Sequence, residues 1–91
     1  MKATHIRSFE IDRVRFHLTD RGDGTQQVTS IHPYDETEYH WALKSRTGTW
    51  RVYREGQLKA NYPAGLTEEQ VAARLLNRDR EAHLTRTGGI W

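Results

Sequence analysis

The sequence predicts a small α+β domain, in which an antiparallel meander sheet of four or five strands packs one face against a single C-terminal amphipathic helix. Three observations predict this fold. Short runs of alternating apolar and polar residues are separated by turn residues. Segment 50–76 has the pattern strand, tight turn, strand, helix. The chain of 91 residues, of which 35% are hydrophobic, is long enough for one modest core, so residues 1–91 are expected to form one domain.

The first dozen residues are expected to form either a strand or an arm. Ile6, Phe9 and Ile11 are apolar, but they are out of phase with the alternation that begins at Val14. Because a change of register moves side chains to the other face of a sheet, a bulge or a turn is expected near residues 12–13.

The sheet is expected to span residues 13–62. Its first clear strand alternates through Val14, Phe16 and Leu18, and it ends at the glycine-containing turn 20–24. Residues 25–31 form the second strand, and their weak alternation is typical of an edge or mostly solvated strand.

Pro33 then interrupts the ladder, because proline has no N–H group to donate. Three further strands are expected at 39–44, 50–53 and 57–62, and Glu55-Gly56 suits a two-residue hairpin turn between the last two. Alternation assigns one set of side chains to the face under the helix: Phe16, Leu18, Tyr39, Trp41, Leu43, Trp50, Val52, Leu58 and Ala60.

The helix is expected to span residues 67–80. Thr67 is a good N-cap, Gln70 is placed to complete a capping box, and Leu66 and Val71 occupy the two positions of a hydrophobic staple. The residues 85–91 are expected to be a flexible tail. One apolar stripe at helical spacing gives the helix a face to bury: Val71, Ala72, Leu75 and Leu76.

The opposite face of the sheet carries the functional signal. His17 and the one acidic residue Glu38 belong to this face by alternation. Basic side chains around an aromatic ring suit a phosphate backbone with exposed bases. The alternative is that these side chains only solubilise an uncovered sheet. On the functional interpretation, one set of residues binds the partner: Arg13, Arg15, His40, Lys44, Arg51, Tyr53 and Lys59.

The rest of the sequence favours a protein without an enzymatic centre. It contains no cysteine and no motif for catalysis, a metal or a cofactor, so no cofactor is expected. The net charge is only +2, but 11 of the 14 cationic residues are arginine, whose planar donors suit phosphate and carboxylate groups. No apolar run suggests a membrane span or signal peptide, so a cytoplasmic location without a membrane partner is expected. The sequence carries no signal for an oligomeric state.

Segment 50–77 resembles the hairpin and covering helix of three-stranded-sheet DNA-binding domains, such as the integrase arm-binding and plant ethylene-response types. The resemblance consists of Trp50-Arg51-Val52, the turn residue Gly56, the basic Lys59 and the helix start at 67–73. It implies that the outward residues of the hairpin enter the DNA major groove: Arg51, Tyr53 and Lys59.

In size and style the whole chain resembles the small inhibitor proteins of phages and mobile elements, including anti-CRISPR proteins. That resemblance implies a protein that occupies a surface of a nucleoprotein complex. We therefore expect a non-enzymatic binding or inhibitor protein that docks on a nucleic acid-containing complex. A DNA- or RNA-binding module that uses the same sheet face is the alternative, and an enzyme is the third possibility.

Overall fold

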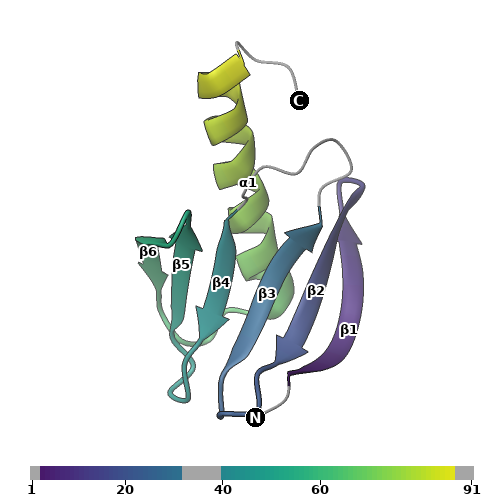
Figure 1. Ribbon diagram of the computed structural model, residues 1–91, viewed down its shortest axis with the longest axis vertical. Helices are drawn as coiled ribbons and strands as arrows, with labels where there is room; N and C mark the ends of the chain where they lie inside the picture. Colours follow the sequence, from purple (N-terminus) through teal and green to yellow (C-terminus); the bar gives the residue numbers. More distant parts are fainter. Residues whose placement is uncertain (1–2, 32–39, 88–91) are drawn as a thin grey trace.

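The computed structural model describes residues 3–31 and 40–87, with side chains for 3–30 and 40–81. Within these residues six strands form one antiparallel sheet in the order in which they follow along the chain, and one helix comes last (Figure 1). The small domain with a meander sheet and a C-terminal helix is confirmed, but there are six strands where four or five were predicted. The elements are β1 (Thr4–Ile11), β2 (Val14–Asp20), β3 (Gln26–Ile31), β4 (Trp41–Lys44), β5 (Trp50–Arg54), β6 (Gln57–Tyr62) and α1 (Glu68–Thr87).

Two tight turns close the outer hairpins of the sheet. Asp12 and Arg13, between β1 and β2, have φ angles of 50° and 69°. Glu55 and Gly56, between β5 and β6, have φ angles of 55° and 76°. Two consecutive positive φ angles are the mark of the hairpin turns that match the twist of the strands they join. Residues 4–11 therefore form a strand, and the turn at residues 12–13 causes the change in the apolar–polar alternation there.

The core lies between the sheet and α1, which packs on β2, β3 and β4. Ala42 of β4 is fully buried there. The C-terminal part of α1 extends past the end of the sheet (Figure 1). Eleven apolar residues form the buried cluster: Val14, Phe16, Leu18, Val28, Ala42, Trp50, Val52, Val71, Ala72, Leu75 and Leu76.

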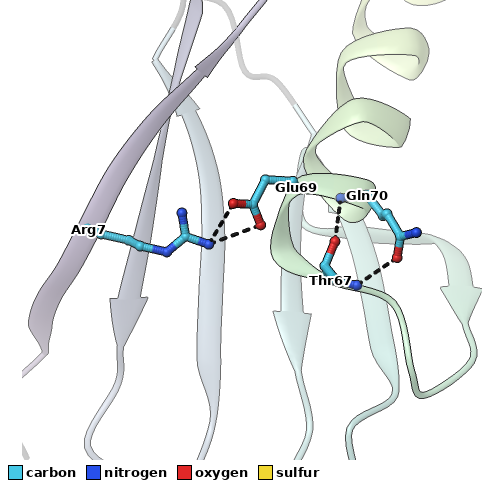
Figure 2. A network of polar contacts seen from close by, with 4 residues as sticks. All are labelled: Arg7, Thr67, Glu69 and Gln70. Atoms are coloured by element: carbon cyan, nitrogen blue, oxygen red, sulfur yellow. Dashed lines mark hydrogen bonds and ion pairs between the residues drawn. The ribbon is translucent and has the colours of Figure 1, made fainter.

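The start of α1 is stabilised by the capping box that the sequence predicts (Figure 2). The hydroxyl of Thr67 accepts a hydrogen bond from the backbone N–H of Gln70 at 3.1 Å, and the Gln70 side chain accepts one from the Thr67 backbone at 2.8 Å. Val71 belongs to the core cluster and the partly buried Leu66 packs against that cluster, as the staple requires. The N-terminal boundary of the helix is thus fixed by side chains next to it in the sequence.

An ion pair ties the edge strand β1 to this helix start (Figure 2). The Arg7 guanidinium lies 3.0 Å from each carboxylate oxygen of Glu69 and 4.8 Å from the centre of the Phe9 ring. The hydrogen bond raises the pKa of Arg7 and lowers the pKa of Glu69. Because both groups are exposed, the pair mainly orients β1 and contributes little to stability.

The predicted edge position of the second strand and the predicted end of the helix are wrong. The strand β3 is not an edge strand, since it pairs with both β2 and β4 and Val28 is fully buried. The helix continues past residue 80 to Thr87, so residues 85–87 are helical and do not belong to a tail. Residues 88–91, Pro33, Glu38 and Tyr39 lie outside the described residues, so the predictions that concern them stay untested.

The predicted orientation of β4 is also wrong. Ala42 faces the helix, so Trp41 and Leu43 lie on the opposite face and are only partly buried. The cause is a buried polar contact before the strand. The backbone N–H and the ring Nδ1 of His40 both lie 2.8 Å from Oδ1 of Asp79 in α1. Because these buried polar groups are hydrogen-bonded, His40 can take the side of the sheet that alternation reserves for apolar residues.

A bulge in β6 moves Leu58 out of the predicted core. Val52 pairs with Ala60, but the next residue of β5, Tyr53, pairs with Leu58, so Lys59 is an extra residue on β6. An extra residue reverses the alternation beyond it. Leu58 therefore shares the face of Tyr53 and is 52% exposed.

Candidate functional site: the open face of the sheet

The face of the sheet opposite the helix carries no described element, and we call it the open face. Its membership follows from the strand pairing and from the burial of Phe16, Leu18 and Val52 on the other side. Fourteen described residues belong to it by this criterion: His5, Ser8, Glu10, Arg15, His17, Thr19, Gln27, Thr29, Trp41, Leu43, Arg51, Tyr53, Leu58 and Asn61.

One half of the open face is aromatic and apolar. Trp41 of β4 and Tyr53 of β5 are directly paired across the strands, and their rings stack with centroids 4.6 Å apart and an angle of 22° between planes. Leu43 lies two residues further along β4, and Leu58 is the partner of Tyr53 on β6. These four residues form the aromatic patch. Cross-strand aromatic pairs of this kind hold each other in one orientation, so the patch is preorganised.

Two of the predicted cations lie on the open face. Arg51 on β5 pairs with Leu43 and Asn61 and is exposed, and it makes no ion pair within the described residues. Arg15 on β2 lies 3.5 Å from Glu10, which is the one acidic residue of the open face in the described part of the chain. Lys59 is exposed in the β6 bulge, where its ammonium group donates to the side chain of Gln57 at 3.1 Å. Cations thus flank the aromatic patch and continue to the far side of the sheet.

The other predicted binding residues lie elsewhere. Arg13 is the second residue of the β1–β2 turn and is exposed at the end of the hairpin. His40 is buried against Asp79, and the ammonium group of Lys44 lies 5.7 Å from the centre of the Trp50 ring on the helix side. The prediction of a single basic face is therefore wrong for these three residues, because β4 has the opposite orientation and Arg13 has left the strand.

A pair of histidines occupies the half of the open face formed by β1 and β2. The rings of His5 and His17 meet edge to face with centroids 5.0 Å apart, and Nε2 of His5 lies 2.9 Å from the Ser8 hydroxyl. Burial, the nearby His5 and the Arg15 charge lower the pKa of His17, in that order of importance. The environment of His17 therefore disfavours the protonated form of its ring.

Sequence reasoning missed four residues of the open face that have binding chemistry. Trp41, Leu43 and Leu58 were assigned to the core, and His5 was in a stretch without an assigned register. A local signal was present only for His5, since the Asp12-Arg13 turn fixes the pairing of β1 with β2. Nothing near β4 or β6 in the sequence indicates the distant Asp79 contact or the bulge at Lys59.

The described residues contain neither a metal-binding cluster nor a helix suited to cross a membrane. Across residues 3–31 and 40–87, no three His, Cys, Asp or Glu side chains gather in a group that could hold a metal ion. Among the same residues, no helix combines the length and the apolar character needed to cross a membrane. The open face is thus the feature from which a function can be argued.

Comparison with known proteins does not assign the chain to a family. No protein-family model matches it, and neither a curated protein nor a solved structure matches it at a significant level. The resemblances to anti-CRISPR proteins and to sheet-type DNA-binding domains therefore remain proposals. The chemistry of the open face has to carry the functional argument.

Proposed function

We propose that this chain is a non-enzymatic binding protein that docks through its open face on single-stranded nucleic acid, in the setting of a nucleoprotein complex. The observation that carries the proposal is the Trp41–Tyr53 stack on an uncovered sheet, beside the exposed Arg51. Exposed aromatic side chains on a sheet, with cations around them, are a common solution for binding unpaired bases and their backbone.

The aromatic patch suits unpaired bases better than a closed duplex. The two rings are partly exposed, and Leu58 extends the apolar surface towards the edge of the sheet. Bases in a duplex are stacked on each other, whereas bases of a single strand are free to stack on protein rings. Each such contact contributes about 1–3 kcal/mol.

The charge of the open face suits an anionic partner. Its described ionisable groups are Arg15, Arg51, Glu10 and two histidines, and the single acid is already paired with Arg15. Lys59 adds a further exposed cation next to the patch. A strand that crosses from β6 towards β1 would therefore meet the cations Lys59 and Arg51 beside the aromatic patch and Arg15 beyond it on β2, which favours attraction of a phosphate backbone.

The edges of the sheet are less suitable for docking than its open face. The strand β1 is irregular between His5 and Arg7, and β6 carries the bulge at Lys59. Interrupted edge strands discourage the addition of a further strand from another chain. A partner is therefore more readily accommodated across the face.

The inhibitor hypothesis is a special case of this proposal. A protein that occupies a strand belonging to a nucleoprotein complex blocks that complex without chemistry of its own, as the resemblance to anti-CRISPR proteins implies. A protein surface of the same complex is the competing occupant of the aromatic patch, because Trp, Tyr and Arg also dominate protein–protein hot spots. The two occupants differ in whether the free strand binds.

The test is the affinity of the purified protein for a fluorescently labelled oligothymidylate strand, measured by anisotropy at several salt concentrations beside a duplex of the same length. We expect the single strand to bind more tightly than the duplex. Arg51→Glu should weaken binding and flatten the slope of log affinity against log salt by about one unit. Tyr53→Ala should cost about 1–3 kcal/mol of binding free energy.

The matched control is Arg21→Glu, which makes the same charge reversal in the exposed turn after β2. It should leave most of the affinity intact, because Arg21 does not lie on the open face. Equal losses for Arg21→Glu and Arg51→Glu would show that only net charge matters. Failure of the free strand to bind at low salt would contradict the proposal and favour a protein occupant.

A further inference from the structure

We infer that His5, His17 and Arg15 form a phosphate subsite on the open face, and that this subsite takes up a proton when a backbone phosphate of the bound strand occupies it. The inference rests on the proposed function, because the phosphate belongs to the strand whose bases contact the aromatic patch. It adds a second anchoring point on β1 and β2, across the sheet from that patch.

The geometry brings three groups with phosphate-binding chemistry together. His17 and Arg15 are alternate residues of β2, so both side chains lie on the open face. His5 on β1 contacts the His17 ring, and its own ring is held by Ser8. Within the described residues the ring nitrogens of His17 make no hydrogen bond, so the imidazole is available to donate to an anionic oxygen.

The surroundings of His17 disfavour its protonated form before the phosphate binds. From the same strand Arg15 faces His17, and from β1 the groups that face it are His5, Ser8 and Glu10; from β3 only the uncharged Gln27 and Thr29 do so. The carboxylate of Glu10 lies on Arg15. The lowered pKa of His17 agrees with this environment, in which burial and the neighbouring His5 and Arg15 oppose a positive charge on the ring.

A phosphate at this position shifts the equilibrium of the His17 ring from the neutral towards the protonated form. Its negative charge, placed against the imidazole of His17, favours the protonated form of this ring and so raises the pKa of His17 in the complex above that in the free protein. Affinity is then independent of pH above the pKa of the complex, rises as the pH falls through that value, and levels off below the pKa of the free protein. Each unit of difference between the two pKa values increases the affinity about tenfold.

The experiment compares the affinity for the labelled oligothymidylate at about pH 8 and about pH 5.5, on either side of the ordinary histidine pKa. We expect the wild-type protein to bind about tenfold more tightly at the lower pH for each unit by which the strand raises the histidine pKa. His17→Gln, whose amide can still donate to a phosphate oxygen but cannot take up a proton, should remove most of this gain. His5→Gln should reduce the gain in the same direction.

The control variant is Glu10→Gln, which separates histidine protonation from protonation of the carboxylate beside Arg15. It should keep the pH dependence of the wild type. A gain that survives in His17→Gln but disappears in Glu10→Gln would overturn the inference. A strand affinity that is independent of pH, with the Tyr53→Ala effect intact, would overturn the subsite but not the proposed function. No strand binding at either pH would overturn both.

A second measurement identifies the source of the phosphate. The pKa of His17 can be followed through its ring protons by NMR, in the free protein, with the oligothymidylate and with inorganic phosphate. We expect the strand to raise this pKa more than inorganic phosphate does at the same phosphate concentration, because the aromatic patch adds affinity for the strand. An increase with inorganic phosphate that equals or exceeds the increase with the strand would mean a site for free phosphate and would overturn the assignment to a strand.

Discussion

The two faces of the sheet use polar and apolar residues in opposite ways. Under the helix, several polar side chains form hydrogen bonds within the molecule: His40 bonds to Asp79, and Arg78 donates to the Tyr62 hydroxyl at 2.9 Å. The Ser30 hydroxyl and the Trp50 indole N–H are buried there without a hydrogen-bond partner among the described residues. On the open face, the large apolar side chains Trp41 and Leu58 are left partly or largely exposed. Polarity alone thus does not reveal which face is inside. The hydrogen-bonded polar groups on the covered face stabilise the fold, whereas the exposed rings of the open face are available to a partner.

The largest effect on stability is expected from the covered face. Leu75 is fully buried in the core cluster. Leu75→Ala should lower the free energy of unfolding by about 2–5 kcal/mol, because it removes buried apolar surface and leaves a cavity. Urea denaturation followed by circular dichroism measures the change. A loss below that of an open-face variant would reverse the assignment of the faces.

A smaller loss should follow when the polar contact beneath the helix is removed. Asp79→Ala leaves the backbone N–H and the ring of His40 buried without their acceptor. A buried group left unpaired costs about 1–3 kcal/mol. Because both His40 groups share the single acceptor Oδ1, we expect a total in the lower part of the summed range, roughly 2–4 kcal/mol, in the same denaturation experiment. Asp79→Asn keeps an oxygen acceptor and should cost less than Asp79→Ala. Equal stability of all three proteins would show that the contact does not orient β4.

The helix cap should contribute less than either core contact. Thr67→Ala removes the acceptor for the Gln70 backbone N–H and should cost about 1 kcal/mol of unfolding free energy. Thr67→Ser, which keeps the hydroxyl, is the matched control and should stay close to the wild type. The affinity for the oligothymidylate should not change in either variant, because the cap belongs to the helix on the covered side of the sheet, away from the open face.

The smallest effect on stability is expected on the open face. Trp41→Ala removes the stack on Tyr53 but leaves no enclosed cavity, since the indole is partly exposed. We expect a loss of about 0.5–1.5 kcal/mol, the range for an aromatic pair. A loss equal to that of Leu75→Ala would mean that Trp41 is a core residue, as the alternation in the sequence predicts.

Local chemistry explains the parts of the fold that could be predicted. The cap at Thr67, the hairpin turn at Glu55-Gly56 and the inward side of β2 depend on residues that are neighbours in the sequence. Such features are determined by hydrogen bonds and steric limits that act over a few residues. The start of β5, the hairpin turn at Glu55-Gly56 and the start of α1 were therefore predictable.

Distant contacts explain the parts that could not be predicted. The orientation of β4 depends on Asp79, which lies 39 positions after His40. Alternation alone prefers Trp41 inside, and only the helix position shows that the small Ala42 fits beneath it. For the candidate site, Arg15, Arg51 and Tyr53 were correctly placed on the open face, whereas the bulge at Lys59 has no signature in the sequence.

The most direct test of the account measures stability and strand affinity together in one double variant, Trp41→Ala with Tyr53→Ala. The central claim is that the covered face holds the fold and the open face binds the strand. We expect the binding free energy for the oligothymidylate to fall by about 1–6 kcal/mol, for one to two lost base contacts. The free energy of unfolding should fall by less than in Leu75→Ala. A folded double variant with unchanged affinity would contradict the claim.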